Sequence, residues 1–146
     1  MDPNALKIYI DGSAYRNPGH ESGLAGIAVF PDFLDREPET IFSEGYNSAT
    51  NNRMELMATI RAFEYIRKNV KALRLPRAII ITDSEYVYGN QRRPQYWRKD
   101  GWIGKNGIEI ENKDLWVKFL SLWPNLGTPT EIKWEKWKTT EILKRV

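Results

Sequence analysis

The sequence predicts an α/β domain in which an antiparallel meander of three strands leads through a long helix into further strands. Three observations predict it. Short apolar segments ended by turn residues come first, a long stretch with helical spacing follows, and a continuous apolar run comes next. The 146 residues have the length of one domain, since single cores usually serve roughly 100–200 residues. We therefore expect residues 1–146 to form a single domain.

The first strands are short and clearly bounded. Residues 7–11 alternate polar and apolar side chains and run into Asp-Gly-Ser, which predicts a strand that ends in a loop. Residues 24–30 are apolar up to Pro31, and a third strand is expected around residues 40–46 after a polar connection. Consecutive strands with such connections favour an antiparallel meander.

A long helix and a buried strand follow the meander. Residues 47–52 supply capping side chains, and Glu55 is expected in the first turn of the helix. Its apolar side chains recur at helical spacing, at Leu56, Met57, Ile60, Phe63, Ile66 and Val70. Pro76 closes this stretch, and residues 78–83 form a continuous apolar run that ends in Asp83, typical of a strand buried on both faces.

The rest of the chain predicts two shorter helices, one strand and a terminal helix. Ser84 can cap a helix through Tyr88, and residues 112–114 can cap another. The second of these helices has one apolar face, made of Leu115, Trp116, Phe119, Leu120 and Trp123. Residues 131–137 alternate as a last strand, and residues 139–146 favour a short helix.

Composition limits the chemistry. The chain has no cysteine and a single histidine, so a bound metal would be a hard ion with oxygen ligands. No apolar run approaches the ~18 residues of a membrane span, and the N-terminus has no secretion signal, so we expect a cytoplasmic protein without a membrane partner. The net charge of +3 is a weak argument for an anionic partner.

The distribution of charge says more than the total. Between Arg92 and Lys105, five basic residues stand against Asp100 alone and are interleaved with Tyr96, Trp97 and Trp102. Such a stretch can neutralise phosphates and offer flat faces to sugars or bases. The alternative is a solvated loop whose tryptophans turn inward.

Three acidic residues lie at element ends that the fold would bring together. Asp11 and Asp83 end apolar strands, and Glu55 begins the helix that joins them. If the two strands are neighbours, the three carboxylates share one site. Clustered carboxylates need a counter-ion, here Mg²⁺ or Mn²⁺, and two such ions perform in-line phosphoryl displacement. Alternatively, each acid is an ordinary turn or helix-dipole residue.

Several segments resemble type 1 ribonucleases H, in the family's order, from about Lys7 to Trp137. They are Ile10–Ser13, Asn17–Gly19, Thr50–Leu56, Thr82–Ser84, Trp97–Trp102, Asn112–Trp116 and Ile132–Glu135. The segment Thr50–Leu56, Thr-Asn-Asn-Arg-Met-Glu-Leu, is highly specific. The resemblance implies a five-stranded mixed sheet flanked by helices. It also implies endonucleolytic hydrolysis of the RNA strand of RNA–DNA hybrids, which leaves 5′-phosphate and 3′-hydroxyl ends.

The same resemblance assigns roles to residues. Asp11, Glu55 and Asp83 match the family's first three catalytic carboxylates, which hold two Mg²⁺ ions, with Mn²⁺ as a substitute. The residues that match contacts to the hybrid are Asn17, Ser48, Thr50, Asn51, Asn52, Tyr86, Arg92, Arg93, Trp97, Arg98, Lys99, Trp102 and Asn112. Among them, Thr50 and Asn112 match part of a pocket for a DNA-strand phosphate, where Ser48 replaces an arginine of some members. The expected partner is the hybrid alone, bound by a monomer with no protein partner.

The sequence departs from the family at its C-terminal end. There the family has a Gly-His loop and then a helix that begins with a fourth carboxylate, and this chain lacks the Gly-His pair. With that loop deleted, Glu141 takes the acid's position, so we expect Glu141 to be a fourth catalytic and metal-binding residue. The alternative is an exposed helix residue in a chain that is cut short or has lost the site. Without the loop histidine we expect slow turnover, and His20 is the only imidazole that could act in its place.

Two other functions remain open. A nuclease-derived module could still bind hybrids through the basic stretch after losing turnover, although three intact acids favour an enzyme. The fold alone would not exclude a different nuclease or integrase that shares it. The segment Thr50–Leu56 disfavours that possibility.

Overall fold

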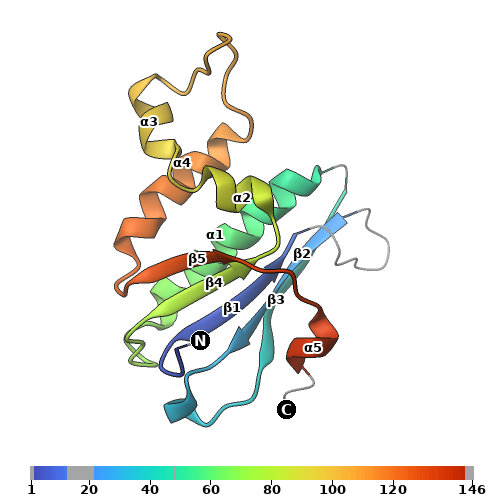
Figure 1. Cartoon of the computed structure of the whole chain (residues 1–146), viewed down its shortest axis with the longest axis vertical. Coiled ribbons are helices and arrows are strands. Elements are labelled where there is room, and N and C mark those ends of the chain that lie inside the picture. Colours follow the sequence, from blue (N-terminus) through green and yellow to red (C-terminus); the bar gives the residue numbers. More distant parts are fainter. Residues whose placement is uncertain (1, 13–21, 48, 144–146) are drawn as a thin grey trace.

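The computed structural model describes residues 2–12, 22–47 and 49–143, so that Asn17, His20 and Ser48 lie outside the described residues. The predicted order of three strands, a long helix and a fourth strand is confirmed (Figure 1). The elements are β1 (Leu6–Asp11), β2 (Ser22–Val29), η1 (Asp32–Leu34), β3 (Glu39–Tyr46), α1 (Asn51–Asn69), β4 (Ala78–Thr82), α2 (Glu85–Asn90), α3 (Pro94–Lys99), α4 (Lys113–Leu122), η2 (Trp123–Asn125), β5 (Thr130–Trp134) and α5 (Thr139–Leu143).

The sheet is mixed and has the strand order β3-β2-β1-β4-β5. The meander strands β1, β2 and β3 pair antiparallel, whereas β4 pairs parallel with both β1 and β5. In this register Ile10 of β1 lies beside Thr82 of β4. The pairing of β1 with β4 therefore ends at one edge of the sheet, and the next residues of the two strands' chains are Asp11 after Ile10 and Asp83 after Thr82.

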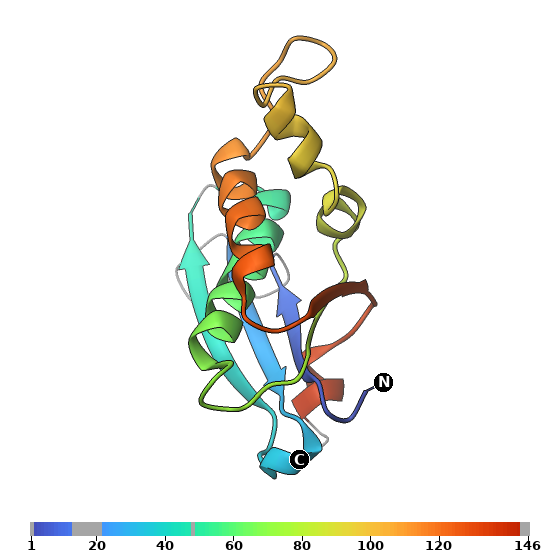
Figure 2. The ribbon, with the colours of Figure 1, turned by 90° about the vertical axis from the view of Figure 1, so that its left-hand side faces the viewer.

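Each face of the sheet is covered by different helices. Helices α1 and α4 pack on one face, where Phe63 and Phe119 bring their ring centroids to 5.2 Å. On the other face Ile142 of α5 is buried in a smaller cluster with Tyr9 and Ile81. Figure 2 shows α5 across the sheet from α1 and α4. Successive side chains of β1 therefore point to opposite faces of the sheet, so that Ile8 and Ile10 are buried in the main core and Tyr9 in the smaller cluster.

Several of the predicted element boundaries were wrong, among them the start of β2, which lies at Ser22 and not at residue 24. The last strand ends at Trp134 rather than residue 137, because its partner β4 has ended and the amide of Glu135 makes the last ladder bond, to the carbonyl of Thr82. The chain then crosses the sheet, where the ring of Trp137 packs edge-on against Tyr9 with centroids 5.5 Å apart. The helix expected to end at Tyr88 continues through residue 90.

The basic stretch contains a helix that the sequence patterns did not predict. Helix α3 begins with Pro94 at its first position, where a missing amide hydrogen is tolerated. Together with the loop that leads to α4, it stands away from the sheet (Figure 1). We call residues 92–102 the basic protrusion; its cations Arg92, Arg93, Arg98 and Lys99 are exposed. No helix in the described part of the chain is long and apolar enough to cross a membrane.

Candidate active site

Asp11 and Asp83 stand at the ends of the neighbouring strands β1 and β4. The backbone around Asp83 is fixed by its neighbours. The indole nitrogen of Trp134 donates to the Asp83 carbonyl over 3.2 Å, and the hydroxyl of Thr82 accepts from the Ser84 amide over 3.0 Å. Ser84 in turn caps α2 by accepting from the amide of Val87, as its position predicted. The direction in which Asp83 leaves the sheet is therefore set by the strand end and the helix start together.

Glu55 reaches this edge because α1 packs directly on the turn after β1. A Cβ atom at Gly12 would lie 2.1 Å from the backbone nitrogen of Glu55, so no residue other than glycine fits there. The amide of Gly12 donates a hydrogen bond to the Glu55 carboxylate. Glu55 is the fifth residue of α1 and not part of its first turn, because Thr50 caps the helix and the helix begins at residue 51.

The three carboxylates influence one another electrostatically. Burial raises the pKa of Glu55 from its ordinary value of 4.5 to about 8; the charges of Asp83 and Asp11 add to this, and the Gly12 amide opposes it. Partial desolvation and the charge of Asp11 raise the pKa of Asp83, whereas Lys136 lowers it. The structure thus brings the three predicted acids into one electrostatic environment in which their negative charges repel.

A divalent cation fits this set of donors. The oxygen Oε2 of Glu55 is buried and has no hydrogen-bond partner among the described residues. A buried carboxylate oxygen without a partner, beside two further acids, gains most from an ion bound by oxygen ligands. Within residues 2–12, 22–47 and 49–143, however, no group of three or more acidic or histidine side chains is arranged so that it could hold a metal ion.

Glu141 lies in α5 and is exposed. It is not among the charges that raise the pKa of Glu55 or of Asp83. The start of its helix is nevertheless close to the acids, because Thr139 and Asp11 line the same cavity of about 320 Å³. The role of Glu141 as a fourth carboxylate stays a prediction.

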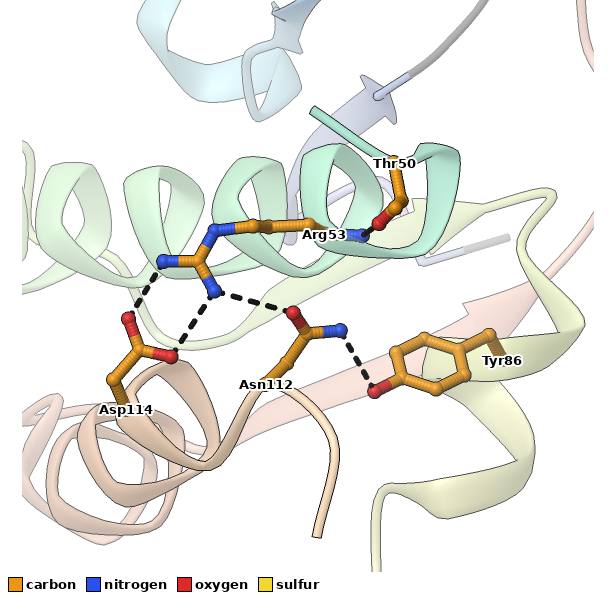
Figure 3. Close-up of polar contacts among 5 residues, drawn as sticks. All are labelled: Thr50, Arg53, Tyr86, Asn112 and Asp114. Carbon is orange, nitrogen blue, oxygen red and sulfur yellow. Dashed lines mark hydrogen bonds and ion pairs between the residues drawn. The ribbon is translucent and has the colours of Figure 1, made fainter. Parts of the chain in front are cut away.

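A second polar cluster joins α1, α2 and α4 (Figure 3). Arg53 of α1 donates to the carboxylate of Asp114 over 2.6 and 3.0 Å, and also to Oδ1 of Asn112 over 3.1 Å. The amide nitrogen of Asn112 donates to the hydroxyl of Tyr86 over 3.2 Å. Thr50, at the start of α1, accepts from the backbone amide of Arg53. One cluster therefore contains Thr50 and Asn112, which were predicted to contact a phosphate, and Tyr86, which was predicted to contact the hybrid.

Sequence reasoning missed two members of this cluster. Arg53 is part of the segment Thr50–Leu56, and Asp114 was interpreted only as a helix cap. The predicted capping by Asn112 was wrong: it stands at the N-cap position of α4, but its side chain makes no capping hydrogen bond and contacts Arg53 and Tyr86 instead. Asn51 and Asn52 are exposed at the start of α1.

The tryptophans of the basic protrusion turn inward. The ring of Trp97 meets Trp116 edge-on at 5.5 Å, and both Trp97 and Trp102 are partly buried against the main core. Tyr96 is the large exposed side chain of α3, with 58% of its surface accessible, and the Lys99 ammonium lies 5.7 Å from its ring centroid. The helical period could have predicted that Tyr96 and Trp97 face different sides of α3, because adjacent residues of a helix point about 100° apart.

Comparisons with known proteins agree with the geometry. A family model described as RNase H matches residues 3–138. Ribonuclease H of Klebsiella pneumoniae is 37% identical over 131 residues, which cover 89% of this chain and 74% of that protein.

Two solved structures share the fold. A foamy viral protease-reverse transcriptase in complex with RNA/DNA hybrid superposes with a TM-score of 0.71 at 17% identity, over 99% of this chain and 19% of that one. RNase H1 of Halobacterium salinarum gives a TM-score of 0.52 at 21% identity, over 97% of this chain and 92% of that one.

Proposed function

As a member of the ribonuclease H family, the chain is an endonuclease for the RNA strand of RNA–DNA hybrids, and we propose that Asp11, Glu55 and Asp83 hold its divalent metal ions. We propose that these acids hold two Mg²⁺ ions, for which Mn²⁺ can substitute. The products would carry 5′-phosphate and 3′-hydroxyl ends. The alternative of a hybrid-binding module without turnover is not favoured by the relatives, which are named as ribonucleases H.

One observation supports the proposed metal site most directly. Glu55 is buried against Gly12 with one carboxylate oxygen unpartnered among the described residues, and its pKa is raised by burial and by two neighbouring acids. Such a group is costly to ionise unless a cation compensates it. When bound, two ions activate water and stabilise the leaving oxygen of an in-line displacement at phosphorus. The protein's own part is to hold three carboxylates at one sheet edge.

Residues away from the acids would grip the DNA strand. Thr50, Tyr86 and Asn112 offer hydroxyl and amide donors to one phosphate. The basic protrusion adds positive charge that neutralises further phosphates. Asn51 and Asn52, exposed where α1 begins, are proposed to contact the hybrid where the 2′-hydroxyl distinguishes RNA from DNA. The proposed contacts of Asn17 and Ser48 lie outside the described residues.

The metal site is tested by replacing single acids with their amides. Asp11→Asn and Asp83→Asn keep the side-chain shape but remove the charge that binds a metal, so Mg²⁺-dependent cleavage of a labelled hybrid should be abolished. Hybrid binding and the far-ultraviolet circular dichroism should survive. Asp32→Asn, at an exposed position in η1, is the matched control and should cleave normally. Wild-type rates in either active-site variant would place the metal site elsewhere.

We also propose that the protein is a monomer and that it acts in the cytoplasm without a protein partner. Light scattering after gel filtration tests the first part, because a monomer must have a mass of 17.1 kDa. Cell fractionation with an antibody to the chain tests the second.

A further inference from the structure

Arg53 makes more contacts than an ordinary surface arginine. Its Nη1 and Nη2 atoms donate to Oδ1 and Oδ2 of Asp114 over 3.0 and 2.6 Å, a two-pronged pairing across 61 positions of sequence (Figure 3). The same Nη1 donates to Oδ1 of Asn112 over 3.1 Å. The pairing with Arg53 is the main cause that lowers the pKa of the Asp114 carboxyl, so the pair stays charged at neutral pH.

These contacts decide which end of the Asn112 amide faces which neighbour. Because Arg53 can only donate, it requires the carbonyl oxygen of the amide on its side. The NH₂ group is then turned toward Tyr86, whose hydroxyl accepts one of its hydrogens and also accepts from the indole of Trp116 over 2.9 Å. Asn112 itself has a φ of +59°, so its backbone places the side chain between two helices instead of over the helix end.

The arrangement leaves donors for an anion. One hydrogen of the Asn112 NH₂ group is not used by Tyr86. The hydroxyls of Tyr86 and Thr50 each accept hydrogen bonds within the cluster and donate to no other described residue, so the hydrogen of each hydroxyl is left to donate. If the Asn112 amide were flipped, its carbonyl oxygen would face the same space and repel a phosphate. The orientation of one amide group therefore separates a phosphate-binding pocket from a phosphate-repelling one.

We propose that Arg53 is a positioning residue that holds the Asn112 amide in the phosphate-binding orientation, and that Asp114 holds Arg53 in turn. The inference rests on the proposed contact between Asn112 and a DNA-strand phosphate, which it deepens. In this arrangement Arg53 serves Asn112 and not the phosphate: the Nη1–Nη2 edge of its guanidinium is paired with the Asp114 carboxylate, and Nη1 also donates to Asn112.

The test compares Arg53→Gln with Arg61→Gln in the full chain. Arg61 lies two turns further along the same helix and is also paired with acids, with Glu44 over 2.8 Å and Glu64 over 3.0 Å, but is no part of the cluster. The Michaelis constant and kcat are measured with Mg²⁺ present, and the salt dependence of hybrid binding is measured in EDTA so that the hybrid stays intact. We expect Arg53→Gln to raise KM by about 3- to 10-fold, the effect of one well-placed hydrogen bond, with kcat unchanged. Arg61→Gln should change neither.

The salt dependence separates positioning from direct binding. Removing a side chain that neutralises a phosphate lowers the log–log slope of affinity against salt by about one, whereas removing a positioning residue leaves the slope unchanged. A slope reduced by about one in Arg53→Gln would show that Arg53 binds the phosphate itself and would overturn the proposal. An unchanged KM would also overturn it.

A second variant keeps the charge. Arg53→Lys retains the positive charge but lacks the planar fork, so we expect it to raise KM as Arg53→Gln does; full rescue by Lys would contradict a role in orienting the amide. In the Asn112→Ala background, Arg53→Gln should have no further effect on KM, because nothing remains to be oriented. Cleavage by Arg53→Gln at saturating hybrid shows that the proposed function stands whatever the outcome for Arg53.

Discussion

The folded chain stabilises the side-chain carboxyl group of Glu55 in its uncharged form. Its pKa is raised by burial, with Asp83 and Asp11 adding to the effect, from 4.5 to about 8. Without metal, the folded protein therefore keeps a proton on Glu55 over a pH range in which the unfolded chain has released it. By linkage, this group makes the stability of the metal-free protein fall as the pH rises from about 4.5 to about 8.

The size of the effect follows from the shift. One pKa unit corresponds to about 1.4 kcal/mol, so the raised pKa of Glu55 lowers the stability of the fold by about 4 kcal/mol at pH 8 and by about 1 kcal/mol at pH 5.5. Glu55→Gln removes this cost, and its oxygen can still accept from the Gly12 amide. Its NH₂ group takes the place of the buried Oε2, and leaving that donor unpaired costs about 1–3 kcal/mol. We expect Glu55→Gln to be more stable than the wild type by about 1–3 kcal/mol at pH 8, and equal to it or less stable at pH 5.5.

Urea unfolding in EDTA at the two pH values measures this difference. Glu64→Gln is the control, since Glu64 is an exposed residue of the same helix and its replacement should have the same effect at both pH values. Added Mg²⁺ should stabilise the wild type and remove the advantage of Glu55→Gln, which should not cleave hybrid at any pH. If the stability difference between Glu55→Gln and the wild type is the same at pH 5.5 and pH 8, the reasoning about Glu55 is wrong.

Four further outcomes are expected. Alanine at the four cations of the basic protrusion should weaken hybrid binding and reduce its salt slope by about one for each phosphate that is no longer neutralised, as salt titrations would show; an unchanged slope would make the protrusion a mere surface element. Trp97→Ala should lower the free energy of unfolding by about 1–3 kcal/mol, because the half-buried ring packs on Trp116, and a drop in hybrid affinity with unchanged stability would contradict this packing role. Gly12→Ala should lower both the melting temperature and the cleavage rate, because its methyl group would overlap the backbone of Glu55; a variant as stable and active as the wild type would refute the close approach. Glu141→Gln should cut the rate by orders of magnitude at low Mg²⁺, with partial rescue by high metal or Mn²⁺, unless Glu141 is no ligand, in which case its metal titration will match the wild type.

The sequence predicted those parts of the fold that depend on local patterns. The meander, the long helix and the buried strand each carry their own periodicity, and the strand ends at Asp11 and Asp83 follow directly from it. The end of β5 did not follow, because a strand continues only as long as its neighbour offers backbone partners, and β4 has no more after Thr82. The alternation of residues 131–137 carries no information on that length.

The convergence of Asp11, Glu55 and Asp83 could be predicted from the sequence, but the energetics of their site could not. That Asp11 and Asp83 leave neighbouring strands follows from strand order, whereas the close approach of Gly12 to the backbone of Glu55 depends on how α1 packs on the sheet. The exposed aromatic side chain of the protrusion was also missed. Without knowledge of α3, nothing in the composition says that Trp97 faces the core while Tyr96 faces solvent.

Helix α1 connects the two halves of the site. Glu55 and Arg53 are two residues apart, and residues at that spacing in a helix point in different directions. One therefore meets Gly12 and the acids at the sheet edge, while the other meets Asn112 and the start of α4. Because both belong to the first two turns of one helix, the distance between the proposed catalytic acids and the proposed phosphate pocket is set by helix geometry. If the proposed contacts hold, a hybrid whose minor groove differs in width from this span would not satisfy both of them, so α1 would help to select the duplex by its shape.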